Sequence, residues 1–155
     1  MNPIGVIRSP WKTIEDMPIQ AIGGEGVVGY IELYPKFIDG LKGLDGFSHI
    51  FLLYLFHRNK DYNLLTKPFL SDNLKGVFAT RAPKRPNPIG LSTVEIISIE
   101  DNIINVRNID ILDETPLLDI KPYVQAFDSF THVKNGWLED AMHRAITYKS
   151  DKSFS

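Results

Sequence analysis

The chain has 155 residues, a formal net charge of −2 and no cysteine, and 43% of its residues are hydrophobic. This composition predicts one folded domain over residues 1–155, with an ordered core over about 3–148. The lack of cysteine excludes disulfides, zinc–thiolate sites and cysteine nucleophiles. The slight acidity argues against broad nucleic-acid binding but leaves room for a local basic patch.

The sequence predicts neither a membrane-spanning segment nor a signal peptide. The longest apolar run, Ile50 to Phe56, is too short to span a bilayer. The first residues, Met1 to Gly5, lack the charged and apolar regions of a signal peptide. We therefore expect a cytoplasmic protein with no membrane partner.

The first half of the chain alternates short strand patterns with turns. Ile4–Ile7 reads as a strand, Trp11–Gly24 as a loop, and Glu25–Leu33 as a second strand. Tyr34–Leu44 predicts one or two helical turns. The continuous apolar segment Phe47–His57 predicts a strand buried on both faces, so that its outer face needs a helix or a second subunit as cover.

The second half continues in the same way and ends in one helix. The expected elements are a polar flap over Asn59–Asp72, a short strand over Gly76–Ala79, a hairpin of Val94–Ile99 with Ile103–Ile109, a strand over Pro122–Phe127, and a packing helix over Gly136–Tyr148. Short strands with a single terminal helix predict an all-β fold. A small antiparallel β-barrel with a short C-terminal helix is our expectation, with a sandwich as the alternative.

One stretch, Lys75 to Ser92, is too unusual for an ordinary turn. Three prolines within six residues stiffen it, because each ring fixes its own φ and restricts the residue before it. Gly90 near its end permits either a φ that other residues avoid or a close backbone approach. The stretch contains no acid and four basic residues: Lys75, Arg81, Lys84 and Arg85. Such a loop suits a carboxylate or phosphate, or else its arginines pair with acids elsewhere in the chain.

The common catalytic and metal-binding patterns are missing. The four histidines, His49, His57, His132 and His143, have no zinc-ligand spacing, so we expect no metal. There is no nucleophile elbow, no phosphate-cradling P-loop and no dinucleotide fingerprint. These patterns therefore do not identify a reaction.

The run Phe78 to Ser92 closely resembles the signature of the TsaA-like family, whose best-known members are the TrmO-type tRNA methyltransferases. Three other stretches fit this resemblance. Met17–Gln20 stands where the family has Pro-Arg-Gln, His57–Arg58 where it has histidine and a basic or polar residue, and Leu112–Tyr123 looks like its Leu-Asp-Gly-Thr-Pro…Asp-Ile-Lys-Pro-Tyr run. Each alone has a simpler explanation: a loop amide, a strand-end histidine, a turn that bonds its own backbone.

The resemblance implies an enzyme: a homodimeric barrel that binds S-adenosylmethionine near the subunit interface. The family reaction is methylation of the exocyclic amino group of threonylcarbamoyl-adenosine beside the anticodon of tRNA. The alternatives are a methyltransferase for a small molecule or another RNA, and a regulator that binds S-adenosylmethionine or RNA without turnover. Two departures bear on the choice, since Ile19 replaces the usual arginine and Glu114 the usual glycine. Longer bacterial members resemble this chain but continue into a C-terminal domain that assists tRNA binding, and the resemblance implies no such C-terminal extension domain here.

The resemblance also assigns candidate residues. The cofactor-binding candidates are Pro18, Ile19, Gln20, His57, Arg58, Arg81, Leu91, Leu112, Asp113, Glu114 and Thr115. The candidates for contacting substrate or RNA are Lys84, Arg85 and Asn87. The proton acceptor stays unassigned, and the candidates for a catalytic role are Arg81, Asn87 and Asp113.

Overall fold

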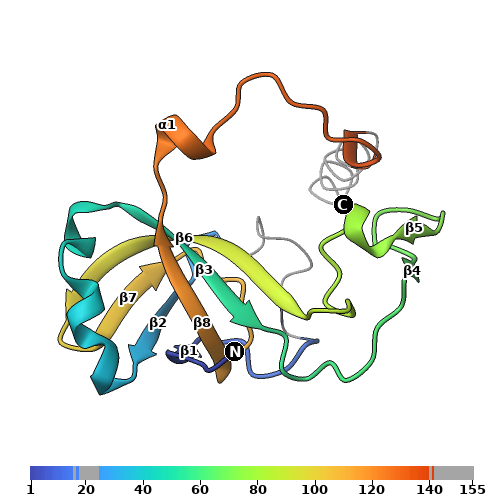
Figure 1. Ribbon diagram of the computed structural model, residues 1–155. Helices are drawn as coiled ribbons and strands as arrows, with labels where there is room; N and C mark the ends of the chain where they lie inside the picture. Colours follow the sequence, from blue (N-terminus) through green and yellow to red (C-terminus); the bar gives the residue numbers. More distant parts are fainter. Residues whose placement is uncertain (16, 18–24, 140, 142–155) are drawn as a thin grey trace, which may run out of the picture.

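The computed structural model describes residues 1–15, 17, 25–139 and 141. The described residues form a closed antiparallel barrel in the order β1-β2-β7-β6-β3-β8 and a separate two-stranded sheet, β4-β5 (Figure 1). The barrel strands are β1 (Gly5–Arg8), β2 (Val28–Leu33), β3 (His49–Leu55), β6 (Ile89–Glu100), β7 (Ile103–Arg107) and β8 (Thr115–Pro122). The prediction of a small antiparallel barrel is confirmed.

Short elements complete the described chain. They are the 3₁₀ turns η2 (Pro35–Leu41), η3 (Leu44–Gly46) and η4 (Val77–Ala79), the strands β4 (Leu65–Thr66) and β5 (Lys75–Gly76), and the helix α1 (Gln125–Asp128). The helical turns expected over Tyr34–Leu44 are present in 3₁₀ form. Pro35 opens η2 with a favourable fixed φ, and Gly43, at φ 83°, separates η2 from η3.

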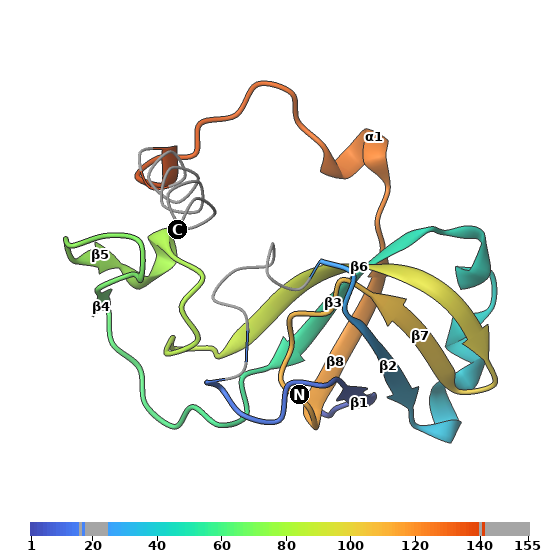
Figure 2. The ribbon, with the colours of Figure 1, turned by 180° about the vertical axis from the view of Figure 1, so that it is seen from behind.

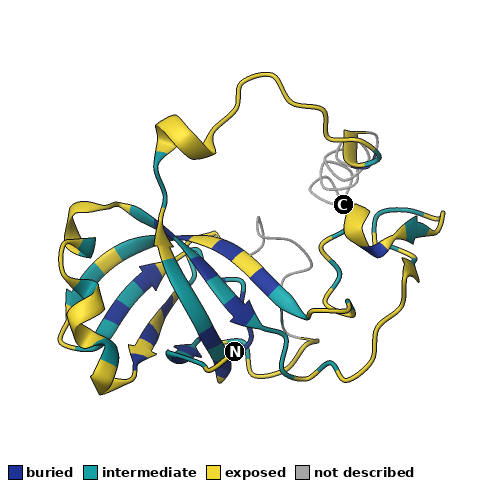
Figure 3. Cartoon of the chain, viewed as in Figure 1, coloured by how far each residue is buried: buried dark blue, intermediate teal, exposed yellow. Residues whose placement is uncertain are grey.

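The barrel core follows from strict alternation of side chains along the strands, visible as alternating colours in Figure 3. Every second side chain points inward, and most of those are β-branched or leucine, which suit a pleated surface. Fully buried examples are Ile7, Ile31, Ile50, Leu52, Val94, Ile104, Val106 and Leu117. Each contributes about 1.5–3 kcal/mol by leaving water. The outer side chains of β3 are half-buried in the single chain, so the predicted cover of this face by a second subunit stays a prediction.

Two strand predictions are wrong. The short strand expected over Gly76–Ala79 ends at Gly76, where the chain enters the 3₁₀ turn η4 instead. No strand covers Pro122–Phe127 as expected. The strand in this region is β8, which precedes the expected segment and ends at Pro122. Proline lacks an N–H to continue a ladder, and the following residues turn into α1. The hairpin prediction is confirmed, although β6 starts earlier, at Ile89.

Two segments leave the barrel. Residues 56–88, here called the excursion, depart after β3, carry β4, β5 and η4, and return at β6 (Figures 1 and 2). Residues 123–139, here called the arch, leave after β8 and swing over to the excursion, where the indole N–H of Trp137 donates to the carbonyl of Ala79 at 2.8 Å. Residues 138, 139 and 141 are helical, and the rest of the expected terminal helix lies outside the described residues.

Candidate functional site

Strand register brings the predicted motif stretches to one end of the barrel. The strands β1, β3 and β7 finish at this end, and β2, β6 and β8 begin there, as the pairs Ile7 with Thr115 and Leu55 with Ile89 show. We call it the loop end. The segments 57–58, 80–90 and 112–115 all adjoin it. Pro18, Ile19 and Gln20, from the fourth stretch, lie outside the described residues.

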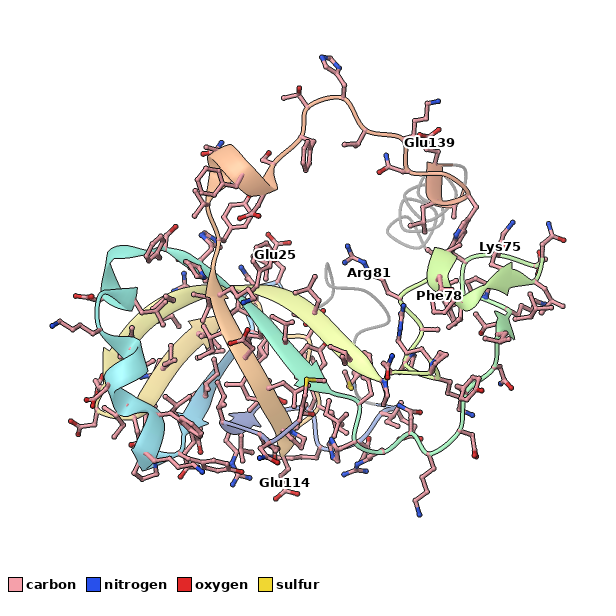
Figure 4. All side chains as sticks on the ribbon, viewed as in Figure 1. Glu25, Lys75, Phe78, Arg81, Glu114 and Glu139 are labelled. Atoms are coloured by element: carbon pink, nitrogen blue, oxygen red, sulfur yellow. The ribbon has the colours of Figure 1, made fainter. Side chains whose placement is uncertain are left out.

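Within the signature loop, the arginines have different tasks. The guanidinium of Arg85 is half-buried and donates to the carbonyls of Thr80 at 3.2 Å and Ala82 at 3.4 Å. Arg85 therefore holds the loop in shape. Arg81 is exposed, makes no ion pair within the described part of the chain, and extends outward from the loop in Figure 4. Lys84 and Asn87, the other predicted substrate contacts in this loop, are exposed as well.

The glycine at the end of this loop has a steric purpose. A Cβ on Gly90 would lie 2.2 Å from Cε2 of Tyr54, so the close backbone approach is the reason for glycine, not an unusual φ. The Tyr54 hydroxyl lies 3.1 Å from Oγ of Ser92, which in turn donates to Oδ1 of Asp110 at 2.7 Å. Three strands or loops far apart in sequence thus build one polar chain at the loop end.

The Tyr54–Ser92–Asp110 chain was not predicted from the sequence. Burial raises the pKa of Tyr54 to about 12; the hydrogen bond with Ser92 opposes that shift, the Asp110 carboxylate adds to it, and the Arg81 cation lowers it. Tyr54 is therefore a neutral phenol at physiological pH. Of these four influences on the pKa of Tyr54, that of Arg81 is the smallest. The available signal was Ser92, the last residue of the family signature.

Asp113 braces the loop end. Its Oδ1 accepts the backbone N–H of Ser9 at 3.0 Å, and its Oδ2 accepts Lys12. Burial alone would raise the pKa of Asp113, but the hydrogen bonds from Lys12, Ser9 and the Glu114 backbone together hold it below its usual range. Its carboxylate therefore bonds the segment after β1 and also the backbone of the adjacent Glu114 within its own turn.

The residues next to Asp113 would contact a ligand mainly through their backbone. Leu112 is 8% exposed and Thr115 is 3% exposed, so their side chains present little surface to a ligand. Glu114 has φ 62°, the left-handed conformation that a glycine would adopt at this position. The departure from the family glycine therefore keeps the turn and adds an exposed carboxylate, which pairs with Arg8 at 3.3 Å. Figure 4 places Glu114 at the rim of the barrel.

The remaining candidates are spread around the loop end. His57 is half-buried and Arg58 exposed, directly after β3. Leu91 is 55% exposed and pairs with Leu53 on the outer face of the β3–β6 sheet, so it does not point toward Asp113. The structure therefore brings the predicted stretches to one end of the barrel without gathering all their side chains around one point.

One polar pocket of about 380 Å³ opens beside the loop end. It is lined by residues of β1, β2 and the segment after β1, and Asp113 is the predicted site residue among them. A second pocket of about 510 Å³ lies under η2 and η3 at the opposite end and contains none of the predicted residues. Among the described residues, no group of three or more metal-ligating side chains occurs, and no helix is long and apolar enough to cross a bilayer.

A small antiparallel barrel with a proline-stiffened basic loop at one end is the class of domain that these observations define. The family model described as the tRNA-methyltransferase O (TrmO) N-terminal domain matches residues 6–129. The chain belongs to this family, and the resemblance inferred from its motifs is confirmed.

Relatives and solved structures agree with this assignment. A probable S-adenosyl-L-methionine-binding protein of Pyrococcus abyssi is 49% identical over 99% of this chain and 83% of its own length. A tRNA (adenine(37)-N6)-methyltransferase of Escherichia coli is 34% identical over 89% of this chain and 63% of its own length. A crystal structure of TrmO superposes with a TM-score of 0.74 at 41% identity, over 87% of this chain and 62% of that chain. The chain thus spans less than two thirds of the solved protein.

Proposed function

We propose that the chain is an S-adenosylmethionine-dependent methyltransferase that acts on the exocyclic amino group of threonylcarbamoyl-adenosine beside the anticodon of tRNA. The observation that carries the proposal is the meeting of the family's motif stretches at the loop end, where Arg81 has no ion-pair partner among the described residues. Family membership and the name of the E. coli relative support the reaction class. A tRNA substrate also fits a cytoplasmic location.

The chemistry of the loop end fits the cofactor. No buried side-chain nitrogen or oxygen of the described residues lacks a partner, so any ligand must use exposed groups and backbone. Arg81 would bind the carboxylate of the cofactor, since an unpaired guanidinium forms strong charge-assisted hydrogen bonds. The backbone of residues 112–115 and the side chains of His57, Arg58 and Leu91 would contact its other parts, together with Pro18–Gln20. Several relatives are named as S-adenosyl-L-methionine-binding proteins.

The bound cofactor would supply a methyl group already activated on a sulfonium, so the protein's main tasks are positioning and shielding. Asn87, held between two prolines, would orient polar atoms of the acceptor. An exocyclic amine must lose a proton when it is methylated. Asp110 is half-buried at the loop end, and its Oδ1 already accepts Ser92, which leaves Oδ2 to take that proton. Asp113 would serve as a brace rather than as a catalytic group.

A homodimer is part of the proposal. The outer face of the β3–β6 sheet presents Leu53 and Leu91, and the arch presents Phe127, Phe130 and Val133, which are 75%, 75% and 56% exposed. A second copy that covers this face would remove apolar surface that single chains rarely leave in water. Sedimentation at micromolar concentration tests it, with a monomer as the contradicting result.

The decisive experiment for the reaction is transfer of labelled methyl from S-adenosylmethionine to total tRNA from cells lacking this protein. Label on threonylcarbamoyl-adenosine would establish both reaction and substrate. Calorimetric cofactor binding without transfer would redirect the search to another RNA or a small acceptor. Arg81→Ala should weaken cofactor binding about 10- to 100-fold, the value of hydrogen bonds to a charged group. Arg107→Ala, which removes a barrel cation paired with Glu95, is the matched control.

A further inference from the structure

Charge is concentrated in the excursion. Residues 56–88 contain seven basic and two acidic residues, a net +5, in a chain whose net charge is −2. The remaining residues therefore carry −7. Residues 75–88 supply +4 of this charge without a single acidic residue, and residues 56–74 add a net +1.

Most cations of the excursion have no ion pair among the described residues. In the barrel strands, Arg8, Arg107 and Lys121 each lie within 4.0 Å of a carboxylate, as does Lys12 in the segment after β1. Within the described part of the chain, the excursion contains the ion pair of Lys67 with Asp72. Among the described residues, no ion pair involves the other lysines of the excursion, Arg58 or Arg81. Unpaired cations on an exposed segment favour an anionic partner.

Aromatic rings lie between these cations. Tyr62 is 56% exposed, and Phe69 and Phe78 are each 76% exposed. Figure 4 shows Lys75, Phe78 and Arg81 on the same part of the excursion. Exposed rings interleaved with unpaired cations are the surface chemistry of proteins that bind single-stranded nucleic acid, because bases stack on the rings while lysines neutralise phosphates.

We propose that the excursion is a platform for single-stranded RNA, with bases stacked on Tyr62, Phe69 and Phe78. This inference rests on the proposed function and identifies where the loop of the tRNA substrate binds. The phosphates are neutralised by Lys60, Lys75 and Lys84. The platform leads directly into the Arg81 loop, so RNA bound on it reaches the loop end of the barrel.

Charge decides between RNA and a second copy as the occupant of this surface. A two-fold dimer brings the same patch of both subunits together, which would oppose two segments of +5. The arch is different, since residues 123–133 contain no lysine or arginine and a single acidic residue. The arch and the outer sheet face therefore suit a second copy, and the excursion suits RNA.

The test is binding of a fluorescent anticodon stem–loop RNA over a salt series, with cofactor affinity and sedimentation measured on the same proteins. Phe69→Ala and Phe78→Ala should each weaken RNA binding roughly 5- to 150-fold, the loss expected for one stacked base. The triple variant K60A/K75A/K84A should lower the slope of log affinity against log salt by about 2, since each single-strand phosphate contributes about 0.7. Tyr34→Ala and Lys42→Ala, at the opposite end of the barrel, are the matched controls.

Three results would overturn the platform. Unchanged RNA affinity and salt slope in the ring and lysine variants, with wild-type protein still methylating tRNA, would refute the platform while the proposed function stands. Dissociation of a dimer by Phe69→Ala or Phe78→Ala, with RNA affinity falling only in parallel, would assign the surface to a second copy. Cofactor binding by wild-type protein without binding or methylation of any tRNA would refute the proposed tRNA substrate and the platform together.

Discussion

The barrel and the excursion differ in how they place apolar and charged side chains. In the barrel, apolar side chains are inside and cations pair with neighbouring carboxylates. In the excursion, Val77 is the single buried residue, the two strands are two residues long, and cations and rings face solvent. The barrel therefore supplies most of the stability, while the cations and rings of the excursion stay exposed to a partner.

The excursion is positioned by a few bonds rather than by a core. The backbone N–H of Val77 donates to Leu64 at 2.9 Å, and Trp137 donates to Ala79. At its base, the N–H of Phe56 donates to the carbonyl of Pro88 at 2.8 Å. Segments with so few buried contacts open locally at little cost, which suits a binding surface that adapts to its partner.

The largest expected effect is on turnover, where the barrel meets the excursion. Asp110→Asn should lower kcat by about 10²–10⁴, the usual contribution of a general base, while cofactor affinity stays unchanged. Single-turnover methyl transfer measures it. Formate should restore part of the activity of Asp110→Ala, a rescue that a purely structural carboxylate would not show. Asp119→Asn, whose carboxylate pairs with Lys121 away from the loop end, is the control and should retain activity.

Alanine substitution of one glycine in each region compares how tightly the barrel and the excursion are packed. Gly90→Ala in the barrel should cost about 1–3 kcal/mol of unfolding free energy, because the new methyl overlaps the ring of Tyr54, itself 6% exposed and packed against Phe56. Gly76→Ala in the excursion meets no atom within 4 Å and has φ −62°, so alanine should be neutral or stabilising by up to about 1 kcal/mol. Urea denaturation distinguishes them, and equal effects would contradict the contrast.

The buried phenol predicts a specific alkaline sensitivity. The folded-state pKa of Tyr54, about 12, lies above the ordinary value of 10.0, so the folded state holds the proton more tightly. The associated stability is present below pH 10 and is lost as pH rises toward 12, by about 2–3 kcal/mol in total. Tyr54→Phe should be less stable than wild type at pH 7, where it lacks the Ser92 hydrogen bond, and should lose less stability above pH 10. Parallel pH curves would contradict this.

The smallest expected effect is at the rim of the barrel. Glu114→Gly relieves a left-handed backbone but gives up the ion pair with Arg8 and adds freedom to the unfolded chain. These terms oppose one another, so the unfolding free energy should change by less than about 1 kcal/mol, as thermal denaturation would show. Cofactor affinity should also be unchanged, because the turn rather than the carboxylate serves the site. A tenfold loss of affinity would show that the carboxylate itself contacts the ligand.

Much of the fold was predictable from local pattern. The strands β1, β2 and β3 and the β6–β7 hairpin follow alternation and turn residues, which act over a few neighbouring positions. β8 was misplaced because Pro116 and Pro122 interrupt its pattern, although both are tolerated near the ends of the strand. The outer face of β3 was expected to be covered, and the described single chain leaves it half-exposed.

The candidate site was predictable only in part. The stiff basic loop and the motif stretches could be recognised by residue type and spacing. The division of labour between Arg81 and Arg85 could not, since both are arginines in the same loop and only the folded loop shows which one bonds its own carbonyls. Asp110 was not predicted, because no neighbouring residue in the sequence indicates that its carboxylate accepts a hydrogen bond from Ser92 on another strand.

The sequence by itself determined the fold class, the family and the rigidity of the signature loop, because alternation, proline chemistry and contiguous motifs are properties of neighbouring residues. Only the tertiary structure decided which charges are paired, which rings stay in water and which polar groups meet. Those outcomes depend on strand register across separations such as the 38 residues between Tyr54 and Ser92. Closing the barrel sets this register. It thereby also sets the contrast between a barrel whose charges are paired and an excursion whose charges and rings are exposed to a partner.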